Sequence, residues 1–223
     1  MLTAFTAGLL LITVSELGDK TFFIAAILAM RHSRRLVLIG VIAALAAMTI
    51  LSVLIGKAAS FLPQKYIDFA EIALFLGFGL KLLYDASKMP AQASCDEFEE
   101  AAAVVEKAEL NLPENAVKKG GNLALTLQSP ELAIVMQSFA MTFVAEWGDR
   151  TQITTIALAA SNNAWGVTFG AILGHSICAL IAVMAGRLIA SRISERTVTA
   201  IGGVLFLIFG FVALIENFSP MIK

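Results

Sequence analysis

Long apolar stretches alternate with short polar connections along the whole chain. Six such stretches cover residues 3–29, 36–60, 66–86, 131–159, 164–190 and 197–217. Each reaches the length of roughly 20 residues that an α-helix needs to cross the hydrocarbon core of a bilayer. The pattern therefore predicts an all-α polytopic membrane protein with six transmembrane helices.

An internal repeat divides these helices into two groups of three. The segment ELGDKT at 16–21 recurs as EWGDRT at 146–151, and the same offset pairs Gly40 with Gly170. We expect a first three-helix repeat over 1–86, an acidic cytoplasmic connector with a short helix over 87–130, and a second three-helix repeat over 131–223. Because three is odd, the two copies must enter the membrane from opposite sides, which predicts inverted repeats with a site at their interface.

Composition sharpens this picture by excluding other classes of protein. Hydrophobic residues make up 58% of the chain and charged residues 15%, against about 45–50% and about 25% in soluble domains. A soluble enzyme is thereby excluded, and motifs such as G-x-S-x-G and H-E-x-x-H are absent. The net charge of -1 offers no basic surface for nucleic acid. We expect the lipid bilayer as the partner and no cofactor, and a homo-oligomer would be compatible with the sequence.

Basic residues predict the orientation in the membrane. When the intramembrane Lys20, Lys81 and Arg150 are set aside, ten of the thirteen remaining Lys and Arg residues fall on one side of the six-helix arrangement. Positively charged connections stay in the cytoplasm. The count therefore predicts that the acidic connector is cytoplasmic and solvated, and that both termini are non-cytoplasmic.

The duplicated motif places ionisable groups where a bilayer tolerates them least. These groups are Glu16, Asp19, Lys20, Glu146, Asp149 and Arg150. Because the two acids of each motif are three residues apart, we expect them on one helix face, about one turn apart. The motif glycines, Gly18 and Gly148, would allow close helix approach or local unwinding, and Thr21 and Thr151 would supply hydroxyl oxygens or bond to the helix backbone.

Four carboxylates in one membrane cavity are suited to a hard cation such as calcium, magnesium or manganese. Glu16, Asp19, Glu146 and Asp149, less the charges of Lys20 and Arg150, would leave a formal charge of -2. When the cation leaves, buried carboxylates should take up protons, because desolvation and mutual repulsion oppose their charged forms. Cations and protons would compete for the same oxygens, which is the physical basis of cation/proton antiport.

Three other interpretations remain open from the residues alone. The charges could be structural, with Glu16–Lys20 and Glu146–Arg150 neutralising each other within a helix. The chain could export small organic solutes such as amino acids, although four carboxylates argue against such a site. It could also be a non-transporting membrane assembly subunit, in which the charges would serve stability alone.

Three further polar residues lie near the motifs without a counterpart in both halves. His175 stands opposite Leu45 and could be a nitrogen ligand favouring manganese or a proton relay, although a hydrogen bond to a neighbouring helix is the more common role. Thr142 lies one turn before Glu146 and could donate to the site or bond to its own helix. Gln152 corresponds to Phe22 and is another polar group without a counterpart, with the same two alternatives of a site role or a structural one.

These residues carry a resemblance to a known family. ELGDKT and EWGDRT resemble the paired E-x-G-D-[KR]-[ST] signatures of the GDT-type cation/proton antiporters, which include the Golgi transmembrane protein 165 and the chloroplast and cyanobacterial manganese transporters. The resemblance implies manganese or calcium transport in exchange for protons. It assigns functional roles to the matching motif residues, which are Glu16, Gly18, Asp19, Lys20 and Thr21 in the first copy and Glu146, Gly148, Asp149, Arg150 and Thr151 in the second. It also implies a bacterial plasma membrane or cyanobacterial thylakoid membrane, since eukaryotic members usually carry an additional N-terminal targeting segment.

Overall fold

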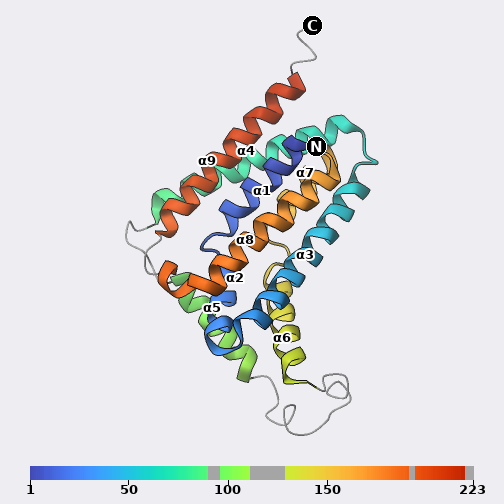
Figure 1. Ribbon diagram of the computed structural model, residues 1–223. Helices are drawn as coiled ribbons and strands as arrows, with labels where there is room; N and C mark the ends of the chain where they lie inside the picture. Colours follow the sequence, from blue (N-terminus) through green and yellow to red (C-terminus); the bar gives the residue numbers. More distant parts are fainter. Residues whose placement is uncertain (90–95, 111–128, 191–193, 219–223) are drawn as a thin grey trace.

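The computed structural model describes residues 1–89, 96–110, 129–190 and 194–218, and the elements assigned in these ranges are all α-helices (Figure 1). In chain order they are α1 (Leu2–Glu16), α2 (Lys20–Arg31), α3 (Arg34–Ala59), α4 (Gln64–Lys88), α5 (Asp96–Leu110), α6 (Pro130–Ala145), α7 (Arg150–Ser161), α8 (Ala164–Ala190) and α9 (Glu195–Phe218). The all-α prediction is confirmed.

The first and fourth apolar stretches are each divided into two helices at the duplicated motif. α1 ends at Glu16 and α2 begins at Lys20, while α6 ends at Ala145 and α7 begins at Arg150. The expectation that the two acids of each motif lie on one continuous helix face is therefore wrong. The helix is interrupted between the acids, so the backbone rather than helical periodicity decides where their side chains point.

Three helices are long and apolar enough to cross a membrane within the described part of the chain. They are α3, the Ala164–Ala185 part of α8 and the Arg196–Asn217 part of α9. α1 and α6 are apolar but shorter, because each is half of a divided stretch. α4 has a comparable length, but charged residues that include Glu71 and Lys81 interrupt its apolar sequence. The six-helix count remains a prediction.

The two halves contact each other reciprocally. A Cβ added to Gly40 of α3 would lie 2.5 Å from the backbone oxygen of Val135 in α6. A Cβ added to Gly170 of α8 would meet the backbone oxygen of Phe5 in α1. Val135 is the repeat counterpart of Phe5, as Gly170 is of Gly40. The same close approach of helices thus occurs twice with the partners exchanged, as a two-fold relation between the halves requires.

The connector helix α5 is docked onto the bundle. Its Ala101 and Val105 are fully buried, and the ring of Phe98 packs edge-on against Phe23 of α2 at 5.9 Å. The expectation of a solvated connector is therefore wrong for this helix, because one face is apolar enough to pack. Of the predicted connector 87–130, residues 90–95 and 111–128 lie outside the described ranges.

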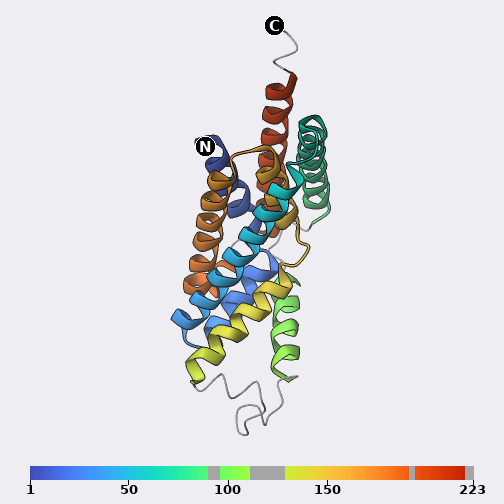
Figure 2. The ribbon, with the colours of Figure 1, turned by 90° about the vertical axis from the view of Figure 1, so that its right-hand side faces the viewer.

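Different elements lie at the two ends of the helix bundle. In both views the start of α1 and the end of α9 point towards one end, and α5 lies towards the other (Figures 1 and 2). α4 and α9 pack against each other in the half of the molecule that contains the start of α1 (Figures 1 and 2). The divided helices place the duplicated motifs between the two ends.

Candidate cation-binding site

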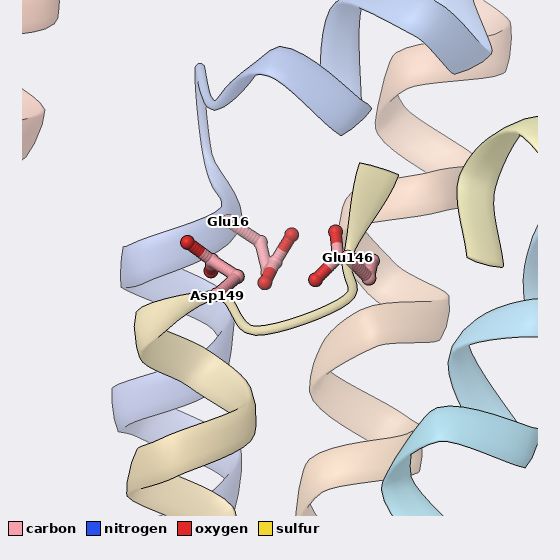
Figure 3. Close-up of side chains that lie close together, drawn as sticks. All are labelled: Glu16, Glu146 and Asp149. Atoms are coloured by element: carbon pink, nitrogen blue, oxygen red, sulfur yellow. The ribbon is translucent and has the colours of Figure 1, made fainter. Parts of the chain in front are cut away.

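Three carboxylates from the two motifs converge inside the bundle. Glu16 ends α1, whereas Glu146 and Asp149 flank the interruption between α6 and α7. One oxygen of each lies within 4.8 Å of the others. Figure 3 shows the carboxylates of Glu16 and Glu146 facing each other, with Asp149 beside Glu16. Since hard cations bind oxygen at about 2.0–2.6 Å, two ligands of one ion lie at most about 4–5 Å apart. The spacing fits a single cation.

In each of the two motif glutamates, one carboxylate oxygen accepts a hydrogen bond and the other has no hydrogen-bond partner. Glu16 and Glu146 are 3% and 2% exposed. Their Oε2 atoms accept hydrogen bonds from Thr21 Oγ1 at 3.2 Å and from Thr151 Oγ1 at 3.4 Å. Their Oε1 atoms are buried without a hydrogen-bond partner. Because an unsatisfied buried oxygen is costly, a bound cation would satisfy these two atoms.

The two motif aspartates have different surroundings. Asp149 Oδ2 accepts hydrogen bonds from the backbone N–H of Thr151 at 3.2 Å and from its hydroxyl at 3.1 Å, which caps the start of α7. Asp19 Oδ1 instead lies 3.7 Å from the guanidinium of Arg150, which also donates to the backbone oxygen of Ser15 at 3.4 Å. Asp149 joins the cluster of three carboxylates, and Asp19 does not.

The motif lysine points away from the cluster. Lys20 Nζ lies 3.3 Å from Glu100 Oε2 of α5, and these side chains are 39% and 67% exposed. Among the described residues, no ion pair joins Glu16 to Lys20 or Glu146 to Arg150. The structural interpretation with pairs inside each motif is therefore wrong. The formal charge around the carboxylates is also one unit more negative than the sequence arithmetic, which had counted Lys20.

Glycine permits the chain to turn at both interruptions. Gly18 has φ +80° and Gly148 has φ +83°, in the left-handed region that favours glycine. Gln152 braces the second interruption: its Oε1 accepts from the backbone N–H of Gly148 at 2.7 Å and its Nε2 donates to Met48 Sδ at 2.9 Å. Local unwinding, one of the two roles expected for the glycines, is confirmed. Gln152 supports the backbone instead of reaching the carboxylates.

Alanine at Gly148 should be destabilising because of the backbone alone. A Cβ added at Gly148 would meet no heavy atom within 4 Å, and the same is true of Gly77 in α4. Gly77→Ala is therefore a control in which the added methyl group also has free space. We expect Gly148→Ala to lose about 1–2 kcal/mol from the left-handed conformation, and Gly77→Ala to gain up to about 1 kcal/mol from helix propensity. Thermal unfolding in detergent compares the two. Equal unfolding temperatures would contradict this explanation of the interruption.

A large cavity leads to the motifs from one end of the bundle. Its volume is about 460 Å³, and Asp19, Asp149 and Arg150 are among the residues that line it. Lys81 and Asp85, near the C-terminal end of α4, line it as well. The sequence places Lys81 inside an apolar stretch and Asp85 at the end of one, but neither residue was among the predicted site residues, although charges inside an apolar stretch were the signal that could have identified them.

A second cavity lies at the opposite end of the α4–α9 pair. Its volume is about 200 Å³, and its lining includes Asp68 and Glu71 from the start of α4 and Glu216 from the end of α9. Asn162 Nδ2 donates to Glu71 Oε1 at 3.1 Å and so links the end of α7 to α4. None of the motif residues lines this second cavity. In this structure the motifs are therefore approached from the end where α4 finishes.

The remaining sequence candidates lie on the other side of the carboxylates. Glu146, Leu45 and His175 line a small cavity of about 10 Å³. His175 is 6% exposed, and its Nδ1 lies 3.9 Å from Glu16 Oε1 without a hydrogen-bond partner. Thr142 is fully buried, and its hydroxyl also lacks a partner. The bond to its own helix that was considered for Thr142 is therefore not formed.

Comparison with known proteins agrees with the repeat and its motifs. Residues 4–90 and 134–221 match the family model described as divalent cation/proton antiporter GDT1. The chain is 62% identical to a GDT1-like protein of Synechocystis over 96% of this chain and 97% of that protein. It is 44% identical to GDT1-like protein 3 of rice, over 92% of this chain and 71% of that protein. No solved structure matches.

One plant relative is longer than this chain. The chloroplastic PAM71-homolog protein of Arabidopsis thaliana is 44% identical over 93% of this chain, but the match spans 58% of the plant protein. The similarity extends through both matched segments and so includes both copies of the motif.

Proposed function

Since this chain belongs to the GDT1 family of divalent cation/proton antiporters, which are transporters and not enzymes, we propose that it exchanges manganese or calcium for protons. The cation would bind to Glu16, Glu146 and Asp149. The observation that carries this proposal is the convergence of one oxygen from each of these carboxylates within 4.8 Å. An oxygen-rich, negatively charged and buried donor set suits a hard divalent cation.

Proton coupling follows from the burial of the same carboxylates. A cation neutralises several negative charges that would otherwise repel one another in a medium of low dielectric constant. After the cation has left, protons on the glutamates are the simplest replacement for its charge. One cluster then alternates between a cation-bound and a protonated form, and neither form leaves the full negative charge buried in the membrane.

Alternating access would use the relation between the two halves. The reciprocal packing of Gly40 and Gly170 supports six spans arranged as inverted repeats, and the large cavity supports access from one end in this structure. The start of α1 and the end of α9 lie opposite α5 (Figure 2), which supports non-cytoplasmic termini and a cytoplasmic connector. The protein would then work in a bacterial plasma membrane or a cyanobacterial thylakoid membrane.

Purified protein in liposomes tests this function directly. The vesicles contain a fluorescent indicator for manganese or calcium together with a pH probe. Their interior is more acidic than the medium, so that protons leaving the vesicle drive exchange. We expect cation entry and proton exit to occur together, and each to stop when the other ion is withheld. Protein-free vesicles are the control for leakage. Cation entry without proton movement would exclude antiport, and no entry of either cation would exclude the proposed function.

A further inference from the structure

The two halves differ chemically at one buried position beside the carboxylates. The second half has His175 in α8 where the first half has Leu45 in α3. Both residues line the small cavity that also contains Glu146. His175 is 6% exposed, and its Nδ1 has no hydrogen-bond partner. A duplication that is otherwise closely matched has therefore placed one imidazole, and not two, at the site.

We propose that His175 is a nitrogen ligand of the transported cation and that it makes the site prefer manganese over calcium. This inference rests on the proposed function, because it assigns a specificity-determining residue to the same site. The donor set would contain oxygens from Glu16, Glu146 and Asp149 and the Nδ1 atom of His175. Calcium takes oxygen ligands, whereas imidazole is a good ligand for transition metals. A nitrogen in the set therefore favours manganese.

The distance to Glu16 supports this assignment, while the group whose ligand atoms all lie within 4.8 Å of one another holds the three carboxylates without His175. His175 Nδ1 lies 3.9 Å from Glu16 Oε1, which is too far for a hydrogen bond but within the separation of about 4–5 Å that two ligands of one ion can have. Glu16 Oε1 also lacks a hydrogen-bond partner. Two unsatisfied polar atoms thus face each other in a buried place, each with a lone pair suited to a metal. A cation between them would satisfy both.

Packing of α8 does not require His175. One turn of helix away, Cys178 Sγ donates to the backbone oxygen of Thr13 in α1 at 3.2 Å. A Cβ added to Gly174 would lie 2.9 Å from Thr13 Oγ1, so α8 already approaches α1 closely beside His175. Residues other than His175 therefore account for the contact between α8 and α1, and the imidazole is available to bind a cation.

Transport selectivity tests the proposal. We expect His175→Leu, which installs the residue of the other half, to lower the ratio of manganese to calcium transport in liposomes by at least about tenfold, since even outer partners of metal ligands change affinity by 10–100-fold. His175→Gln keeps a polar side chain of similar length and provides a second variant. Cys178→Ala perturbs the same helix and should leave the ratio unchanged. An unchanged ratio in both His175 variants overturns the ligand role but leaves cation/proton exchange intact.

Spectroscopy on bound manganese gives an independent answer that packing would not affect. In pulsed electron paramagnetic resonance of wild-type protein loaded with Mn²⁺, we expect modulation from one directly bound ¹⁴N nucleus, and its loss in His175→Leu. Wild-type protein that binds Mn²⁺ without this modulation overturns the proposal for His175 alone. Wild-type protein that neither binds nor transports either ion overturns the proposed function together with it.

Discussion

Glu16→Gln and Glu146→Gln should each lower cation-coupled proton exchange by at least about 100-fold. Each change keeps the size of the side chain but removes one negative charge and replaces one of the two carboxylate oxygens by an NH₂ group, which cannot bind a cation. One unit charge at about 4 Å is worth about 4 kcal/mol at an effective dielectric constant of 20, and a 100-fold change in affinity requires only about 2.8 kcal/mol. The loss of charge is therefore large enough even after part of it is screened.

Glu131→Gln is the matched control, because this glutamate lies exposed in the first turn of α6. It should transport at the wild-type rate. Both site variants should elute from size-exclusion chromatography as the wild type does, which separates loss of the site from loss of the fold. They should also bind Mn²⁺ more weakly by isothermal titration calorimetry. Wild-type exchange in both variants would exclude Glu16 and Glu146 as ligands.

The sequence identified the residues of the site better than it identified their arrangement. Duplication of the motif predicted that Glu16, Glu146 and Asp149 meet, since related copies of a segment come together at a repeat interface. It also predicted Asp19 as an equal member. In this structure Asp19 lies 3.7 Å from the guanidinium of Arg150 and outside the cluster of three carboxylates, because the two motifs have similar local sequences but different surroundings. A role for Asp19 in cation binding stays a prediction.

Long-range contacts explain the other differences from expectation. Lys20 lies beside Glu100, which is 80 residues away in a helix that the sequence presented as part of a solvated connector. The spacing of four residues predicted Glu16 as the partner of Lys20, because side chains at i and i+4 are neighbours in an uninterrupted helix. The sequence did not predict that the helix is interrupted, because a glycine permits a positive φ but does not require it. Surrounding structure decides which option is taken.

Gly40→Ala and Gly170→Ala should both destabilise the protein severely and by similar amounts. At each position a Cβ would press on a backbone oxygen, that of Val135 for Gly40 and that of Phe5 for Gly170. A flexible side chain could rotate away, but these oxygens belong to α6 and α1, so two helices must separate along their contact. Overpacking of this kind costs about 1–3 kcal/mol, and we expect the upper part of that range. Thermal unfolding in detergent measures the loss.

Gly77→Ala again provides the control, because no atom lies within 4 Å of its added Cβ. It should be neutral or stabilising, so the difference from the other two variants isolates the helix contacts. Since Gly40 and Gly170 are counterparts with exchanged partners, equal losses are expected only if the two contacts are equivalent. A severe loss in one variant and none in the other would show that the halves are held together asymmetrically. A two-fold relation would then be a poor basis for alternating access at the carboxylates between them.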